Sequence, residues 1–370
     1  MNAFSTKHTR FLETLNSIPD GDKIKFEEVG HKYFAYSKYY TDWVSKEEGL
    51  GGLPIVSATG VLDKYFHFDR DGLALNIWKV PGNRHKMLHD PTYKYYGCTS
   101  VSDIIDKWSG GAIEGTKMHA IYEDLANLVE YDKANPDQAS GLMMNLYAEA
   151  TLGGYHEKAY FYEFVKQFKL DDPSSGMHFH RTELKLWHDV LHFTGTIDAL
   201  LYNKRDNSYI IVDWKRCGGG VKLEGLNLRP ARQLAVKSRG RGLEAFEGMR
   251  NSKLNRYGCQ LTLYARLFEH MTGERISALY IVSVDSKKIG ARSALKLIDI
   301  PMDKYKEAIR QAFEERAREM LSTCDSTLDS DHMDELIKYL DEGEAIRATR
   351  YEEEIKKRKR EEEEEREEKI

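Results

Sequence analysis

The chain has 370 residues, of which 31% are charged and 41% hydrophobic, and its formal net charge is −5. This length allows one large domain with extensions or two smaller domains. No run of about 18 apolar residues occurs, and the opening MNAFSTKHTRFLETLNS lacks the apolar centre of a signal peptide. We therefore expect a soluble, intracellular protein without a membrane span. The slightly acidic balance does not by itself indicate a nucleic-acid-binding protein.

Residues 1–98 predict an N-terminal extension with short strands. The segments HKYFAY and LPIVSATGVLDKYF are rich in β-branched and aromatic residues and are separated by a polar loop that contains glycines. A long helix is expected next, from Val101 to about Tyr131, because apolar residues recur there at helical spacing. Residues 142–169 predict further helices, whose many aromatic side chains suit a core.

The centre of the chain predicts a mixed sheet flanked by helices. Strands are expected at about 179–188, 193–202 and 208–216, followed by a long, glycine-rich and basic loop over residues 217–255. The segment YGCQLTLYARLFEHM predicts a helix that ends at Gly273, and ISALYIVSV predicts a further strand. KLIDIP and a last packed helix over residues 302–322 complete this region. The order helix, three strands, helix, strand predicts an α/β architecture.

The C-terminal part is much more charged. From about Asp334 the composition changes, and residues 351–370 hold 10 acidic and 7 basic side chains. This pattern predicts a helical or disordered tail over residues 326–370, exposed to solvent. The basic run Lys356–Arg360 leaves nuclear localisation open.

The stretch GTIDALLYNKRDNSYIIVDWKR predicts a β-hairpin with charged residues inside its strands. A turn between Arg205 and Asp206 would set Asp198 directly opposite Asp213, with Cβ atoms about 5 Å apart. Lys215 would share their face, because it lies two residues beyond Asp213. Two carboxylates this close repel each other unless a cation lies between them, and oxygen ligands suit Mg²⁺ or Mn²⁺. The alternative is a surface hairpin with a local salt bridge, against which the apolar run IIV argues.

Three other elements could contribute to the same site. GTKMHAIYE places His119 and Glu123 on one helical face, and Gly115, one turn earlier, would let another group approach closely. Gln260 and Tyr264 are also four residues apart on one helix. Glu183 lies on the first strand of the sheet. The alternatives are a hydrogen-bonded histidine in the core and an ordinary half-buried helix.

Other candidate metal ligands are weaker. His178 and His180 form an HxH pair suited to zinc, but no third ligand accompanies them in the sequence. His85 and His89 lie in basic, loop-like surroundings, where solvent exposure is expected. The four cysteines are scattered without a CxxC pair, which argues against a zinc ribbon or an iron–sulfur cluster.

Taken together, GTKMHAIYE, GTIDAL, VDWK and QLTLY resemble the RecB-like branch of the PD-(D/E)XK nuclease superfamily. Members of that branch show G…H…E, GxxD, D-x-K and QxxxY in this order. The resemblance covers roughly residues 100–285, and the opening HKYF…SATGVLDKYFHFD is similar to viral and phage-type members. The mitochondrial genome maintenance exonuclease is a relative of the same type. The resemblance implies a restriction-endonuclease-like core of α-β-β-β-α-β order over residues 99–325.

The resemblance also implies roles for individual residues. The metal, Mg²⁺ or Mn²⁺, would be bound by His119, Asp198 and Asp213, with the backbone carbonyl of Trp214 as a further ligand. Lys215 would be the catalytic lysine, Glu123 and Glu183 would be acidic supports, and Gln260 and Tyr264 would position the DNA strand or buttress the site. The cysteine quartet of the iron–sulfur relatives is absent, so no cluster is expected.

These residues predict a metal-dependent deoxyribonuclease, specifically an exonuclease that acts on single-stranded ends in replication, repair or recombination. The loop 217–255 carries a net charge of +5 and would track the DNA backbone. No zinc finger or clear helix-turn-helix is recognisable, which disfavours sequence-specific cleavage. The alternatives are a structure-specific flap or junction endonuclease and a catalytically weak DNA-binding accessory module. A helicase or replication partner is compatible with each of them.

Overall fold

The computed structural model describes residues 10–16, 24–27, 32–36, 43–45, 55–66, 69–139, 141–152, 156–217, 246, 248–249, 251–285, 296–323, 330–346 and 349. The first described elements are the short helix α1 (Phe11–Leu15) and a three-stranded antiparallel sheet of β1 (Ile24–Glu27), β2 (Lys32–Tyr36) and β3 (Trp43–Ser45). This small sheet packs on the main body through Ile24, which lies against Ile55 and Trp187.

The segment LPIVSATGVLDKYF is mainly helical, so the expected strand is wrong beyond its first residues. Strand β4 contains only Val56–Ser57, and helix α2 follows over Ala58–Tyr65. The Ser57 side chain accepts a hydrogen bond from the Gly60 backbone N–H and so caps the helix. Val61, Leu62 and Tyr65 then fall on one helical face and are buried. An apolar run with β-branched residues concealed this period of 3.6 residues.

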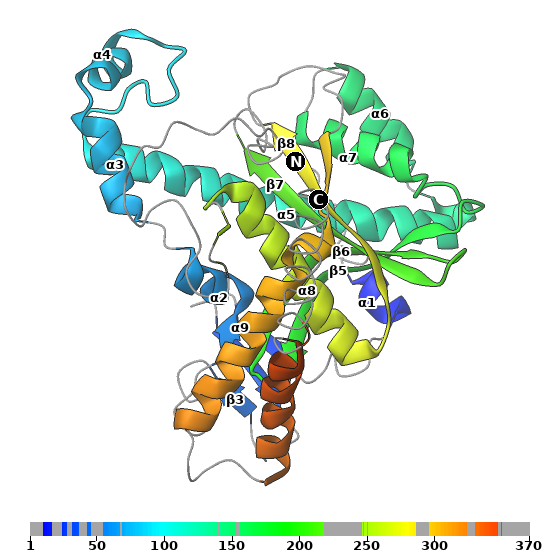
Figure 1. Ribbon diagram of the computed structural model, residues 1–370. Helices are drawn as coiled ribbons and strands as arrows, with labels where there is room; N and C mark the ends of the chain where they lie inside the picture. The colour runs from blue at the N-terminus through cyan, green and yellow to red at the C-terminus, as the bar shows by residue number, and fades with distance from the viewer. Residues whose placement is uncertain are drawn as a thin grey trace, which may run out of the picture.

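Three helices build a projection at one end of the molecule (Figure 1). Helices α3 (Arg70–Lys79) and α4 (Pro81–His89) pack against the start of the long helix α5 (Val101–Ala134), which Ser100 and Asp103 begin with a reciprocal capping box. His85 and His89 therefore lie on a helix and not in a loop, although both are exposed as expected. The 3₁₀ turn η3 (Pro136–Gln138) and helices α6 (Leu142–Leu152) and α7 (His156–Phe168) follow.

Among the described residues, the main sheet has six strands of mixed direction. Its strands are β4, β5 (Met177–His188), β6 (Phe193–Asn203), β7 (Ser208–Cys217), β8 (Ile276–Asp285) and β9 (Lys296–Asp299). The order is β4-β6-β7-β8-β9, with β5 paired to β6. β5, β6 and β7 are antiparallel neighbours, whereas β8 is parallel to β7 after the crossover helix α8 (Lys253–Thr272). Helix α8 ends at Gly273, whose φ of 71° is the left-handed conformation that glycine favours.

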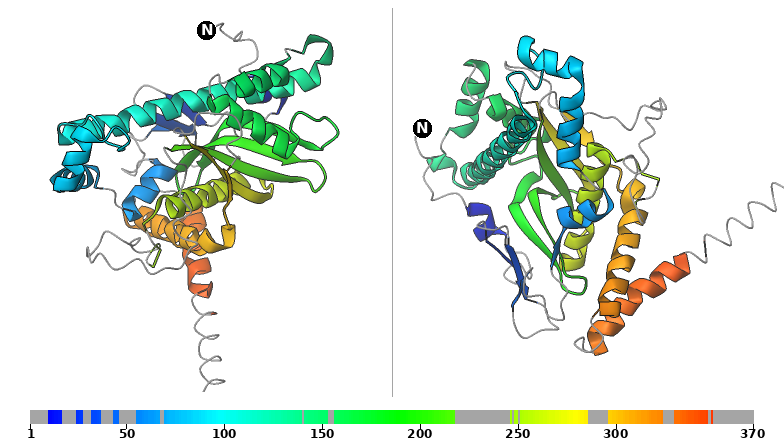
Figure 2. Two further views of the ribbon diagram at one scale, coloured as in Figure 1. Left: turned by 90° about the horizontal axis from the view of Figure 1, so that it is seen from above. Right: turned by 90° about the vertical axis from the view of Figure 1, so that its left-hand side faces the viewer.

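Helices cover both faces of this sheet (Figures 1 and 2). α2, α8 and α9 (Met302–Thr323) pack on one face with Phe193, Ile197 and Ile281 of the strands. α5, α6 and α7 pack on the other face, where Phe161, Phe164 and Trp214 form an aromatic cluster. The protein is thus an α/β protein with a mixed open sheet between helical layers. None of the helices in the described ranges is long and apolar enough to cross a membrane.

Residues 330–346 form a further helix, which packs on the main body. Leu336 is fully buried in the same apolar cluster as α8 and α9. His332 is also buried, and its Nε2 lies 2.8 Å from the backbone carbonyl oxygen of Val190. This part of the charged C-terminal region therefore contributes to the fold, whereas Lys356–Arg360 lie outside the described residues.

Candidate functional site

Strands β6 and β7 separate next to Asp198 and Asp213. The five pairs from Asn203–Ser208 to Ala199–Val212 have the predicted register, which would set Asp198 opposite Asp213 at the next step. The backbone ladder ends before that step. The Trp214 N–H instead donates a 2.8 Å hydrogen bond to the Asp198 side chain at Oδ2. A carboxylate thus occupies the position of a backbone acceptor at the point where the strands diverge.

Glu183 joins Asp198 from the other side of β6. Its neighbours Thr182 and Leu184 pair with Ala199 and Ile197, so Glu183 lies across from Asp198 in the register. Its φ is +46°, a left-handed conformation that costs a residue with a side chain roughly 1–3 kcal/mol. The strain occurs at the one position of β5 that faces the hairpin carboxylate.

His119 approaches these carboxylates from α5. Its Nε2 lies 3.0 Å from the Trp214 carbonyl oxygen, which can only accept, so Nε2 carries a proton and donates. Its Nδ1 lies 3.5 Å from Asp198 Oδ2 and 4.0 Å from Glu183 Oε1. One donor atom from each of His119, Glu183 and Asp198 lies within 4.8 Å of the other two. Three separate elements therefore bring one nitrogen and two carboxylates together.

The charges of the three groups depend on one another. Burial opposes a charged imidazole, but Asp198 outweighs burial and raises the pKa of His119 to about 9. Burial, followed by repulsion from Asp198, raises the pKa of Glu183 to about 8. Burial also acts against the Asp198 carboxylate, yet His119 holds the pKa of Asp198 below its ordinary value. A positive charge is thus needed here, from a proton or a metal ion.

Asp213 and Lys215 form a buried ion pair next to this group. The Lys215 Nζ donates a 2.7 Å hydrogen bond to Asp213 Oδ1 and also lies 2.7 Å from Oδ2. Burial raises the pKa of Asp213 to about 6 in spite of the lysine. Burial opposes the ammonium, yet Asp213 and Asp198 raise the pKa of Lys215 above its ordinary value. The Nζ also lies 5.0 Å from the ring centroid of Tyr257 on α8.

Gln260 and Tyr264 support the site from α8. Gln260 Nε2 donates a 2.7 Å hydrogen bond to the Tyr264 hydroxyl, and Tyr264 is only 6% exposed. A Cβ atom at Gly195 would lie 2.4 Å from the Tyr264 ring, so the glycine of GTID gives the ring room. Tyr264 is therefore placed to buttress β6 at Gly195, which is one of the two roles that the resemblance implies for it; a role in positioning the DNA strand stays a prediction.

The other predicted residues lie near this site with different surroundings. Glu123 is one turn of α5 beyond His119 but does not belong to the three-residue group; burial, followed by the charge of Asp124, raises its pKa. Trp214 is buried, and its carbonyl oxygen contacts His119. A Cβ atom at Gly115 would meet nothing within 4 Å, so no described neighbour requires that glycine. Of the basic loop, residues 218–245 lie outside the described residues.

The residues present suit a divalent cation. When Nε2 of a neutral His119 donates to the Trp214 carbonyl, the Nδ1 lone pair faces Asp198 and Glu183. Asp213 Oδ2 is buried and accepts no well-aligned hydrogen bond among the described residues. The geometry hence favours His119, Glu183 and Asp198 as the metal ligands. Asp213 stays a predicted metal ligand, although its carboxylate forms an ion pair with Lys215.

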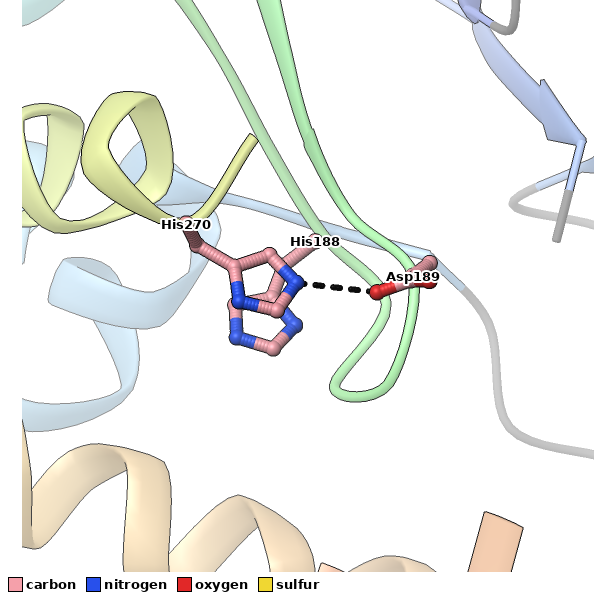
Figure 3. Close-up of side chains that lie close together, drawn as sticks. All are labelled: His188, Asp189 and His270. Atoms are coloured by element: carbon pink, nitrogen blue, oxygen red, sulfur yellow. Dashed lines mark hydrogen bonds and ion pairs between the residues drawn. The ribbon is translucent and has the colours of Figure 1, made fainter. Parts of the chain in front are cut away.

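A second group of possible ligands, which the sequence did not reveal, lies at the β5–β6 turn (Figure 3). His188 and His270 stack with ring centroids 3.7 Å apart, and His270 Nε2 lies 2.9 Å from Asp189 Oδ1. His188 Nδ1 accepts from the Leu191 N–H, and its Nε2 lies 2.9 Å from the Tyr339 hydroxyl. Parallel rings do not aim their lone pairs at one point, and both nitrogens of His188 are engaged. These contacts hold the turn, and the orientation of the rings makes this group a less suitable metal site than the group at His119.

The HxH pair remains without a third ligand in the described part of the chain. The rings of His178 and His180 lie 6.5 Å apart, beside Tyr202. Neither histidine belongs to a group of potential metal ligands there.

No protein-family model matches the sequence, and no similar protein was found among curated proteins. Functional inference therefore depends on the geometry of the site and on the sequence motifs.

Proposed function

We propose that this protein is a metal-dependent nuclease that hydrolyses DNA phosphodiester bonds. The observation that carries the proposal is the convergence of His119, Glu183 and Asp198 beside the buried Asp213–Lys215 pair. The same residues belong to the motifs that resemble the RecB-like PD-(D/E)XK nucleases. The α/β fold, with an antiparallel β5–β6–β7 unit and a parallel β8 after α8, is compatible with that core.

The roles of the residues follow from their contacts. His119, Glu183 and Asp198 would hold Mg²⁺ or Mn²⁺, which would supply positive charge to the scissile phosphate. Lys215 provides a fixed ammonium that donates hydrogen bonds to a phosphate oxygen or to the attacking water. Asp213 keeps that ammonium charged and in place through their 2.7 Å contact. The Trp214 carbonyl fixes the His119 tautomer, and Tyr264 supports β6 at Gly195.

The test is cleavage of end-labelled single- and double-stranded DNA with Mg²⁺, with Mn²⁺ and with a chelator. We expect the Asp213→Asn variant to lose cleavage while its DNA affinity stays within a few-fold, because phosphate contacts supply most of the affinity. The matched control is Asp189→Asn, which removes a carboxylate from the second histidine group and should cut normally. Wild-type cleavage by Asp213→Asn, or cleavage that the chelator leaves unchanged, would contradict the proposal.

We further propose that cleavage starts from single-stranded ends. This part rests on the family resemblance and on the sequence, which shows no recognisable base-reading module. A covalently closed single-stranded circle distinguishes an exonuclease from a flap or junction endonuclease, since both would use the same catalytic residues. Efficient digestion of the circle by a preparation free of other nucleases would overturn the requirement for an end.

A further inference from the structure

The projection formed by α3, α4 and residues 90–98 is a packed unit outside the sheet. It has an apolar cluster of its own, made by Ala74, Met87 and Tyr95 with Ile104 of α5. Hydrogen bonds fix it to α5: Trp108 Nε1 donates to the Tyr95 hydroxyl at 3.2 Å, and Lys107 Nζ donates to the Tyr96 carbonyl at 3.1 Å. Arg70 at the start of α3 also donates to the Ile105 carbonyl and to the Ser109 hydroxyl of α5. We call residues 70–98 the arm.

The outer surface of the arm is basic and partly apolar. Lys79, Arg84, Lys86 and Lys94 are exposed, and Asp90 is the single carboxylate between residues 79 and 96. None of these four cations forms an ion pair with a carboxylate of the described chain; three of them lie 5.0–5.9 Å from the ring centroids of Trp78, Tyr93 and Tyr95. Among the exposed large hydrophobic side chains of the described residues, six lie between residues 73 and 113.

The arm and the candidate site are connected by the long helix α5. His119 on α5 contacts Trp214 of β7. Figure 1 shows β7 ending on the side of the sheet where α3 and α4 project. The helical rise of 1.5 Å per residue puts Lys107 about 18 Å from His119 along the same helix.

From this placement we propose that the arm binds the phosphate backbone of a single nucleic-acid strand that extends from the candidate site. The inference rests on the proposed nuclease function. Cations that form no ion pair within the described part of the chain supply the charge complementarity, and exposed apolar and aromatic side chains suit the faces of unpaired bases. Since Lys107 lies about 18 Å from His119, the arm would contact phosphates several nucleotides from the scissile phosphate.

The test measures binding by the full chain with Asp213→Asn as background, so that no strand is cut. The arm variant carries Lys79→Gln, Arg84→Gln, Lys86→Gln and Lys94→Gln. The matched control removes the same charge from exposed positions elsewhere, with Lys169→Gln, Lys204→Gln, Arg205→Gln and Lys306→Gln. All these side chains are exposed, so both proteins should keep the parent melting temperature. The probe is a labelled 20-nucleotide strand, titrated at several salt concentrations.

We expect the arm variant to lose at least about tenfold in affinity for the 20-mer and the control to stay within twofold. The salt dependence of the arm variant should fall by up to about 3 units in log–log slope, at about 0.7 per phosphate contact. Neutral methylphosphonate linkages, moved along the 20-mer in separate probes, should weaken binding by the parent at a set of positions several nucleotides from the labelled end and leave the arm variant unchanged. Equal affinities and slopes for arm variant and control would overturn the inference and point to a protein partner for the arm. If the parent itself bound no nucleic acid, the proposed function would fail as well, which separates the two outcomes.

Discussion

Glu183 and Asp198 are brought together by two different local devices. Glu183 takes a left-handed backbone conformation inside a strand, and Asp198 replaces a backbone acceptor for the Trp214 N–H. The left-handed backbone of Glu183 costs free energy, and the Asp198 side chain interrupts the regular hydrogen bonding between β6 and β7. Both features orient a carboxylate towards His119. Burial and repulsion from Asp198 raise the pKa of Glu183 to about 8. The negative charges of Glu183 and Asp198 are therefore poorly balanced when no cation is bound.

Mn²⁺ or Mg²⁺ should therefore raise the melting temperature of the wild-type protein. A ligand present at 100 times its Kd adds about 2.7 kcal/mol to the free energy of unfolding. The double variant Glu183→Gln, Asp198→Asn should lose this effect in a thermal-shift measurement, because two of three donors become neutral amides. The double variant His188→Gln, His270→Gln serves as the comparison and should keep the metal response. A reversed pattern would move the metal site to the β5–β6 turn.

Gly195→Ala should destabilise the protein by about 1–3 kcal/mol, because the new methyl group would overlap the buried Tyr264 ring. Gly115→Ala is the matched control in α5: its methyl group meets nothing within 4 Å, and alanine favours a helix by up to about 1 kcal/mol. Denaturant unfolding measures both. A neutral Gly195→Ala would show that the ring moves freely and does not fix β6.

At the scale of elements, sequence reasoning succeeded where the signal was local. The β6–β7 register followed from a short turn, and the end of α8 followed from Gly273. The helix α2 was not predicted, because the β-branched residues in and before it are typical of a strand and concealed its apolar helical face. The left-handed Glu183 was not predictable, since it depends on the pairing of β5 with β6, which sets Glu183 across from Asp198 and leaves no local pattern.

The helix at residues 330–346 was concealed for a related reason. Its sequence is dominated by charged residues, and the few buried side chains are identified only by partners far away in the chain. His332 contacts Val190, 142 residues earlier, and Tyr339 contacts His188, 151 residues earlier. The charged composition correctly predicted that much of this helix is exposed to solvent. It gave no information on the side of the helix that packs against the main body.

Leu336→Ala should therefore lower the free energy of unfolding by about 2–5 kcal/mol, as expected for a fully buried leucine. Ile337, the next residue, is 42% exposed, so Ile337→Ala should change stability by less than about 0.5 kcal/mol. Chemical denaturation of both variants measures the difference. Equal effects would show that the helix does not pack on α9 in solution.

In the molecule as a whole, charged side chains on the described helices and charged side chains in the candidate site are arranged in different ways. Most ion pairs on the helices link neighbouring turns, as between Arg310 and Glu307 or Lys338 and Glu335. The candidate site instead concentrates three carboxylates, one imidazole and one ammonium that come from four elements. Such a constellation depends on long-range packing, which explains why motifs could name its members while only the structure gives their contacts.

Histidines on β5 should make the stability of the whole fold sensitive to acid. Burial is the main cause that lowers the pKa of both His178 and His180 to about 4; nearby Lys133 adds to the effect at His178, and Arg181 at His180. In the unfolded chain each titrates near its ordinary value of about 6.5. Between these values the unfolded state binds more protons, so stability should decrease as pH falls from about 6.5 to about 4.

The double variant His178→Gln, His180→Gln should reduce this decrease, by less than about 1.4 kcal/mol per pH unit for each histidine. The control is His85→Gln, His89→Gln, which changes two exposed histidines and should leave the profile unchanged. Free energies of unfolding at pH 7.5, 6, 5 and 4.5 separate the two variants. Carboxylates that titrate in the same range affect all the proteins alike, so the difference between variants isolates the histidines. Parallel profiles for the two double variants would mean that His178 and His180 take up protons as readily in the folded protein as in the unfolded chain.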